Sequence, residues 1–366
     1  MQEIHIADRL VEHRRKKGIR QEELAQFLGV SKAAVSKWES DRSYPDITLL
    51  PQLAAYFNIS VDELLGYEPQ MLREDIRRLY RRLAAAFASR PFAEVLAECN
   101  DILQKYYACF PLLLQMAVLL MNHAQLADDS GEVLEQAAGL AGRVKTESDD
   151  VHDAKQGALL EAACRLLLRQ PERALELQDE QVRPMLQDTE LLAQTYQALG
   201  DADKAGRVWQ ISLYQHVVAL VGGAANLLLL YAGDREKSGE ILRRAEGVIA
   251  LFQVERLHPN AVAGLYLTAA QLACTRGDLD RALDHLSRYA DLCPRFFPCV
   301  LHGDDFFDAL DDWFAEFALG SDAPREEKLI RASMLQAVRD QPIFAPLAGL
   351  PRFQGILDRI ARSLEL

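Results

Sequence analysis

The chain has 366 residues, 49% of them hydrophobic and 26% charged, and a formal net charge of −13. This composition fits a folded chain with room for two or more domains and argues against disorder. Residues 1–66 carry 9 Lys and Arg against 10 Asp and Glu, and the remaining residues carry 32 against 44. Because neither part has a positive net charge, any contact with nucleic acid has to come from a local basic face.

The first predicted helix covers residues 4–17. Its apolar positions recur at helical spacing and are Ile4, Ala7, Leu10 and Val11. The basic run 14–17 is followed by Gly18, a combination typical of a helix C-terminus.

Two short helices follow, Gln21–Leu28 and Lys32–Ser40. Gly29 supplies a left-handed residue for the turn between them, and Ser31 is the predicted N-cap of the second. Small Ala25, opposite Val35, allows the two helices to cross closely.

After a loop over residues 41–45, we predict a fourth helix over about 46–57 and a fifth that Ser60 caps. Residues 6–66 resemble the lambda-repressor-like (Xre) helix-turn-helix family. The match includes Q-x-x-L-A-x-x-L-G-V-S from Gln21, V-S-K-W-E from Val35 and S-V-D-E-L-L-G from Ser60. The resemblance implies double-stranded DNA as a partner.

In this family the second helix of the motif lies in the major groove. The resemblance therefore assigns base contacts to its exposed residues. Lysines donate to guanine, and an alanine methyl contacts a thymine methyl. The start of the preceding helix and the following loop are expected to contact phosphates. The candidate DNA-binding residues are Gln21, Ser31, Lys32, Ala33, Ser36, Lys37, Arg42, Ser43 and Tyr44.

Arg14 and Glu39 match family positions that form a buried ion pair; the alternative is two solvated surface charges. Trp38 is expected in the core. Because the N-terminal segment is nearly neutral, one copy should bind DNA weakly, which implies a homodimer on a two-fold operator.

From residue 71 on, the sequence predicts helix after helix. The turn that starts at Gly200 recurs at Gly233, 33 residues on, and again at Gly277, a further 44 on. These units resemble tetratricopeptide repeats, with weaker units around 73–106, 110–145 and 152–184; the alternative is an irregular helical bundle. The longer offset predicts an extended helix or insertion near Phe252–Pro259.

Two further elements are predicted near the C-terminus. Residues 302–314 form an amphipathic helix that buries Phe306, Phe307, Leu310 and Phe314, and its aspartates are a solvated face rather than a metal site. Residues 342–366 cap the last apolar face.

The predicted fold class is therefore all-α, a five-helix lambda-repressor-like domain followed by an α-solenoid of tetratricopeptide-like hairpins. The predicted domains are residues 1–67, 68–300 and 301–366, the last as a capping segment.

Nothing in the sequence predicts an enzyme. Phosphate-binding, nucleophile-elbow, zinc-protease and EF-hand motifs are missing, and six scattered cysteines make no C-x-x-C. We therefore expect no cofactor, no metal and, without a signal peptide, a cytoplasmic protein. Residues 217–232 are apolar but are expected to form a buried repeat helix, with no membrane contact.

The two modules together resemble bacterial peptide-sensing regulators of the helix-turn-helix plus tetratricopeptide type. Those regulators hold a signalling peptide with asparagines on inner helices, and the candidates for a peptide or small effector here are Asn226, Asn122 and Asn260. Asn226 is expected inside an otherwise apolar inner helix, where its amide either forms a hydrogen bond within the protein or binds a ligand. Two other functions stay open: repeats that serve only dimerisation or partner binding, and an adaptor without an operator.

Overall fold

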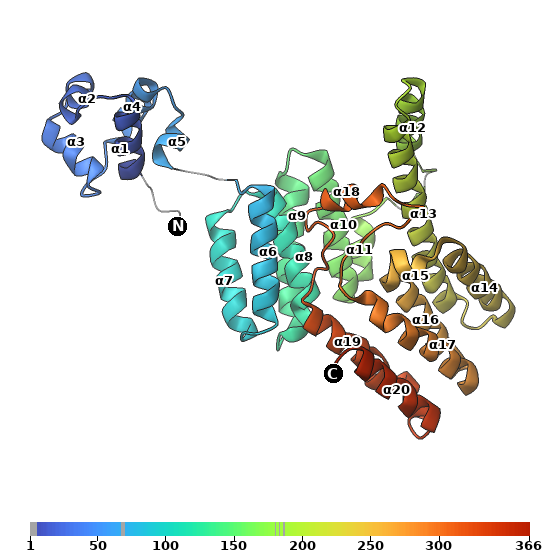
Figure 1. Cartoon of the computed structure of the whole chain (residues 1–366). Helices are drawn as coiled ribbons and strands as arrows, with labels where there is room; N and C mark the ends of the chain where they lie inside the picture. Colours follow the sequence, from blue (N-terminus) through green and yellow to red (C-terminus); the bar gives the residue numbers. More distant parts are fainter. Residues whose placement is uncertain (1–5, 67–69, 180, 183, 186) are drawn as a thin grey trace.

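The computed structural model describes residues 6–66, 70–179, 181–182, 184–185 and 187–366 (Figure 1). Within these ranges every regular element is a helix, and one isolated antiparallel bridge joins Val300 to Asp322. The predicted all-α class is confirmed. Ile4 and the predicted border between residues 67 and 68 lie outside the described residues.

The N-terminal helices enclose their own core. They are α1 (Ile6–Lys16), α2 (Gln21–Leu28), α3 (Lys32–Glu39), the 3₁₀ turn η1 (Ile47–Leu49), α4 (Leu50–Phe57) and α5 (Val61–Leu65). Leu24, Val35 and Trp38 are buried at their centre, as expected for Trp38. In Figure 1 this group stands to one side of the longer helical body.

Local signals set the ends of these helices. Gly29 has φ 69°, and Ser31 Oγ accepts from the Ala34 N–H at 3.2 Å, as predicted. The fourth helix begins later than expected, at Leu50. The cause is Asp46, whose carboxylate accepts from the backbone N–H and hydroxyl of Thr48 and holds a 3₁₀ turn first.

The first half of the helical body consists of antiparallel hairpins. They are α6 (Arg73–Phe87) with α7 (Phe92–Lys105), α8 (Phe110–His123) with α9 (Ser130–Glu147), and α10 (Val151–Leu167) with α11 (Pro171–Glu176); η2 (Ala124–Leu126) follows α8. These pairs fall on the three weaker units expected from the sequence. At Gly157 a side chain would meet Ala141 O at 2.7 Å, which explains how α9 and α10 pack so closely.

The second half contains α12 (Asp188–Ala198), α13 (Ala202–Leu230), α14 (Arg235–Phe252), α15 (Val254–Leu257), α16 (Pro259–Thr275), α17 (Leu279–Leu292) and η3 (Cys293–Phe296). The three turns that repeat in sequence also act alike, because Asp201, Asp234 and Asp278 each cap the helix that follows. The extra residues between the second and third turns form α15, which begins after a left-handed Gln253.

The C-terminal elements are α18 (Leu310–Ala315), α19 (Glu327–Arg339), η4 (Pro342–Leu347) and α20 (Pro351–Ser363). The prediction of a helix that begins at residue 302 is wrong, since α18 begins only at Leu310. The Asp304 carboxylate accepts from the N–H groups of Phe306 and Phe307 and makes a turn instead. Phe307, Leu310 and Phe314 are buried as predicted, whereas Phe306 is 60% exposed. Further on, α20 packs on α17.

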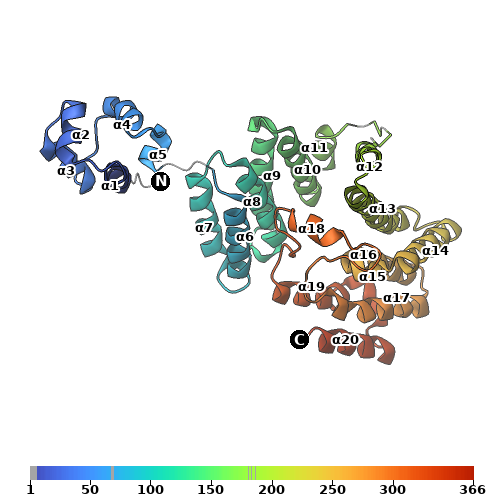
Figure 2. The ribbon, with the colours of Figure 1, turned by 45° about the horizontal axis from the view of Figure 1, so that its top comes forward.

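Residues 315–325, which we call the strap, connect the two halves of the helical body. On α6, the Arg77 guanidinium donates to the carbonyls of Ala315 and Phe317 at 3.0 and 2.7 Å, and Tyr80 donates to Pro324 O at 2.9 Å. Figure 2 shows α18, which leads into the strap, on the inner side of the arc that the hairpins form. The strap therefore fixes the C-terminal segment against the first hairpin.

The long helix α13 differs from its prediction. It was expected to be buried, but only 28% of its most apolar 18-residue window is covered. Five leucines on it are exposed: Leu213, Leu220, Leu227, Leu229 and Leu230. Among the described helices it alone is long and apolar enough to cross a membrane, a criterion of length and composition that core helices of soluble proteins also meet.

Candidate nucleic-acid interface and effector cleft

Helix α3 presents the predicted base-reading residues to solvent. It packs on α1 and α2 through Val35 and Trp38. The opposite side of the helix is exposed and carries Lys32, Ala33, Ser36 and Lys37. In Figure 1 α3 lies at the edge of the molecule farthest from the hairpins. A helix with this exposed face is accessible to the major groove of a duplex.

The flanking candidates differ in how free they are. Arg42, Ser43 and Tyr44 form an exposed loop directly after α3. Gln21 is half-buried instead, and its amide donates to Glu39 Oε2 at 2.9 Å. An exposed ion pair joins Lys32 to Glu22 and lowers the pKa of that glutamate. Lys32 therefore exchanges this partner when it meets a base or a phosphate.

Arg14 and Glu39 lie in contact between α1 and the end of α3. The Arg14 Nε and Nη2 atoms are 2.5 and 3.0 Å from the two Glu39 carboxylate oxygens, and its Nη1 donates to Ile19 O at 2.9 Å. The side chains are only 15% and 6% exposed. The hydrogen bond to Glu39 raises the pKa of Arg14. The pair holds the C-terminal end of α3 on the first helix.

Replacing Arg14 should loosen α3, because Glu39 would remain buried without its cation. We expect Arg14→Ala to lower the free energy of local unfolding by about 3 kcal/mol. Hydrogen exchange of the α3 amides measures this. Arg9→Ala, which breaks an exposed pair with Glu12, is the control and should change protection little. Equal protection in both variants would contradict a structural role for the Arg14 pair.

Two of the three candidate asparagines lie at one cleft. Asn122 from α8 and Asn260 from the start of α16 both line a cavity of about 390 Å³, the central cleft, although 138 residues separate them. Asn226 is elsewhere: it is exposed, and its Nδ2 donates to Gly222 O at 3.1 Å within α13. Its prediction as a residue of an inner helix is wrong, because the side of α13 that carries it is uncovered.

The central cleft also contains residues that the sequence did not single out. They come from α15 and α16, from η3 and the loop after it, from the strap and from α19: Arg256, His258, Arg295, Phe296, Cys299, His302, Asp322, Arg325, Ile330 and Met334 are among them. Burial lowers the pKa of His258 and raises that of Cys299 to about 11, so both are neutral near pH 7. The arginines are the cations of this site.

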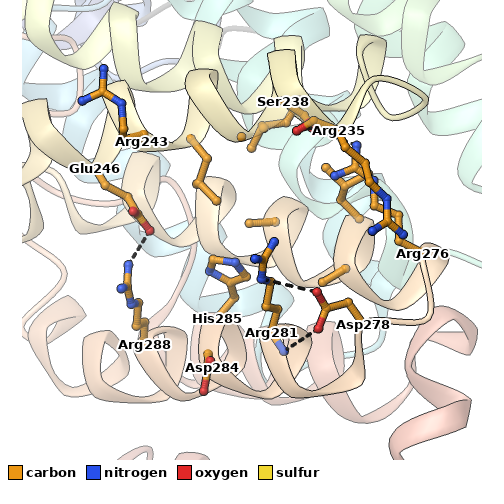
Figure 3. Close-up of a pocket in the computed structure, with 16 residues that line it drawn as sticks. Arg235, Ser238, Arg243, Glu246, Arg276, Asp278, Arg281, Asp284, His285 and Arg288 are labelled. Carbon is orange, nitrogen blue, oxygen red and sulfur yellow. Dashed lines mark hydrogen bonds and ion pairs between the residues drawn. The ribbon is translucent and has the colours of Figure 1, made fainter.

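A second cleft, of about 330 Å³, lies between α14, α16 and α17 and is shown in Figure 3. Several arginines line it, but most already have partners. Arg288 pairs with Glu246 and Arg281 with Asp278 at 3.3 Å. Arg276 donates to Ala232 O at 2.7 Å. Arg288 and Arg276 hold neighbouring helices together, and Arg281 pairs with the N-cap of its own helix, which gives the second cleft a structural explanation.

The geometry of residues 6–66, with five short helices, a capped α3 and an exposed outer face, is that of a DNA-binding helix-turn-helix unit. Residues 10–64 match the family described as Helix-turn-helix. The N-terminal domain of this chain is thus an Xre-like helix-turn-helix domain, as its sequence motifs indicated.

Three bacterial proteins are similar to this part of the chain. The HTH-type transcriptional activator BcrR of Enterococcus faecalis is 34% identical over 79 residues, which are 20% of this chain and 39% of BcrR. The HTH-type transcriptional regulator AnsR of Bacillus subtilis is 40% identical over 63 residues, 17% of this chain and 54% of AnsR. ImmR, another HTH-type regulator of B. subtilis, is 29% identical over 96 residues, 26% of this chain and 76% of ImmR.

The chain thus spans about half or less of the length of the first two relatives. Among solved structures, apo ComR from S. thermophilus is 14% identical and aligns with 79% of this chain and 92% of its own, at a TM-score of 0.24. At that score the alignment supports no conclusion about the helical body.

Proposed function

We propose that this chain is a sequence-specific DNA-binding transcriptional regulator, dimeric on a two-fold operator, whose helical body senses a peptide or small effector. The observation that carries the DNA-binding part is the outer face of α3, where Lys32, Ala33, Ser36 and Lys37 are exposed on a helix anchored from behind by Val35 and Trp38. The relatives of this domain are transcriptional regulators by name, which supports the same function.

Two features support dimerisation: the low net charge of the N-terminal domain and the exposed leucines of α13. The near-neutral N-terminal domain neutralises few phosphates alone, so two copies strengthen binding. On α13, Leu213, Leu220 and Leu227 recur every seven residues, and no Asp, Glu, Lys or Arg occurs from residue 208 to 233. In an antiparallel two-fold pair centred on Leu220, Leu213 faces the partner's Leu227. This stripe matches itself, so we propose a second copy as its occupant.

A second candidate function is a regulator whose helical body only dimerises and holds no effector. The exposed leucines of α13 favour it, since they explain the helical body without a ligand. Occupancy of the central cleft distinguishes the two functions.

Selection of bound sequences from a random DNA library tests the proposed function directly. Specific binding to a selected two-fold site should weaken steeply with salt, because each neutralised phosphate releases counterions. With six or more phosphate contacts, affinity should fall by about 10³ between 50 and 200 mM salt. Fluorescence anisotropy of the labelled site measures it. A flat salt response, or a selection that enriches no sequence, would refute DNA as the partner.

A further inference from the structure

The central cleft contains a guanidinium without a counterion. Arg325, at the end of the strap, is half-buried, and its Nε is enclosed without an acceptor. Over the residues that the structure describes, no hydrogen bond or ion pair reaches the other nitrogens of this side chain. Burial lowers its pKa, because the cation has lost part of its water without gaining a partner. Cations in such places normally have an anion.

Over the described residues no carboxylate pairs with Arg325: Glu326, the next residue in the chain, forms no ion pair or hydrogen bond with it, and three other acids are engaged elsewhere. Asp322, three residues before Arg325, pairs with Arg81 on α6. Glu255 pairs with Arg295 at 3.0 Å. Glu327 accepts from the Cys299 N–H at 3.3 Å. None of these acids neutralises Arg325, so the missing anion has to come from outside the chain.

The fully buried His123 lies close enough to Arg325 for the charge of the guanidinium to act on it. Its pKa is lowered first by burial and then by the charge of Arg325, while its Nδ1 contacts Leu119 O at 2.8 Å. A neutral His123 cannot serve as the counterion. The guanidinium is therefore one unneutralised positive charge on the wall of a cavity.

We infer that the central cleft binds a small monocarboxylate with an apolar body, whose carboxylate pairs with Arg325. This inference rests on the proposed function, in which the helical body senses an effector. A planar carboxylate matches the two parallel N–H donors of a guanidinium. Arg256, the other cleft arginine without an acid partner, is exposed and donates to Gln253 Oε1 at 3.3 Å, so Arg325 is the one partly desolvated, unpaired cation and balances one negative charge. A phosphate dianion would leave a charge unbalanced in this site.

The other walls fit such a ligand. Phe296, Ile330 and Met334 offer apolar contacts, and Asn122 and Asn260 offer amides. The Asn122 Nδ2 donates to Val118 O at 2.9 Å, which leaves its oxygen as an acceptor for a polar group of the ligand. A cavity of about 390 Å³ is within the size range of small-molecule sites.

The position of the cleft couples binding to the shape of the helical body. Asn122 belongs to the first half, Asn260 belongs to the second, and Arg325 is on the strap that α6 holds. A ligand that contacts all three parts favours one arrangement of the two halves over others.

Calorimetry on the full chain tests the inference with octanoate and its uncharged analogue octanamide. We expect octanoate to bind with a Kd on the order of 1 mM or tighter, and octanamide at least tenfold more weakly, about 1.4 kcal/mol. Acetyl-leucyl-leucine and its C-terminal amide form a second pair. If the free acid binds more tightly than its amide in the peptide pair, the carboxylate of the natural ligand is assigned to the end of a short peptide. If this difference occurs in the octanoate pair, the ligand is assigned as a free organic acid.

Three variants locate the site. Arg325→Gln should reduce octanoate affinity at least tenfold (about 1.4 kcal/mol) without lowering the melting temperature, since it removes an unpaired buried charge. Asn260→Asp puts a carboxylate on the cleft wall, in the first turn of α16 where an acid suits the helix, and should weaken octanoate to a similar degree. Arg339→Gln, an exposed position on α19 paired with Asp340, is the control and should bind like the native chain.

Equal binding of the acid and its amide in both pairs, full octanoate binding by Arg325→Gln, or no heat from either acid at about 10 mM would overturn the inference. DNA binding is measured on the same preparation. If the native chain binds its operator but no carboxylate, only the carboxylate site is refuted. If it binds the carboxylate but no operator, the proposed function is refuted and the site is retained.

Discussion

The double variant Lys32→Ala with Lys37→Ala should lose specific operator binding while its fold is unchanged. Both side chains are exposed on α3. Each good contact to a base edge contributes about 1–3 kcal/mol, so removing two should weaken specific binding by roughly 10²-fold or more. Titration of a selected operator against a scrambled duplex measures the change, and circular dichroism shows whether the helices persist.

A matched control separates base reading from net charge. Lys155→Ala with Lys328→Ala removes the same two charges from exposed positions on α10 and α19. This control should keep operator affinity within a few-fold, because long-range charge effects are screened beyond about 10 Å at 0.1 M salt. If both double variants lose affinity equally, α3 has no special role and the assignment of the recognition helix is wrong.

The single variants carry different information. If a lysine contacts a base, its replacement should relax the base preference at one operator position. If a lysine contacts a phosphate, its replacement should weaken binding to all sequences equally and reduce the salt dependence of the affinity. Lys32, whose exposed pair with Glu22 must open first, and Lys37 can therefore be assigned separately by repeating the selection with each variant.

The N-terminal domain is predictable from its sequence because local interactions determine its helices. Ser31 and Ser60 cap the helices that follow them, and Gly29 makes the left-handed turn, all with neighbours a few residues away. The repeated Gly-Asp turns of the helical body are predictable for the same reason, since Asp201 and Asp278 cap helices directly after them.

Failures occur where a local turn competes with the apolar pattern or where distant parts of the chain decide. The apolar pattern around Phe306 predicts a helix, but Asp304 makes a turn there and α18 begins at Leu310. Hydrophobicity alone did not show that one face of α13 is uncovered. The central cleft depends on Arg325, which precedes α19 without any helical pattern and reaches the cleft because α6 holds the strap.

Leu220→Glu should convert a dimer into monomers if α13 is the interface. In the two-fold pairing, Leu220 meets its own copy, so each dimer would bury two like charges at the centre of an apolar stripe. Desolvating an unpaired carboxylate costs several kcal/mol, which is enough to shift association by at least 10²-fold. Analytical ultracentrifugation over a range of protein concentrations measures the change in the dissociation constant.

The control for this variant is Leu251→Glu on α14, where the leucine is 77% exposed and outside the stripe. It introduces the same charge and should leave the dimer intact. A native chain that sediments as a monomer, or a Leu220→Glu chain that remains dimeric, would contradict α13 as the interface. In the first case the stripe has another occupant, such as the exposed leucines Leu159 and Leu166 on α10.

Dimer loss also predicts a result on DNA. Because each near-neutral N-terminal domain is expected to bind DNA weakly alone, the affinity for a two-fold operator should depend on the contact that holds two copies together. Leu220→Glu should therefore weaken binding to a two-fold site by about 10²-fold or more and leave a half-site unaffected. Equal loss on both sites would mean that the substitution disturbs the N-terminal domain, and equal retention on both would mean that the domain binds its operator without a partner.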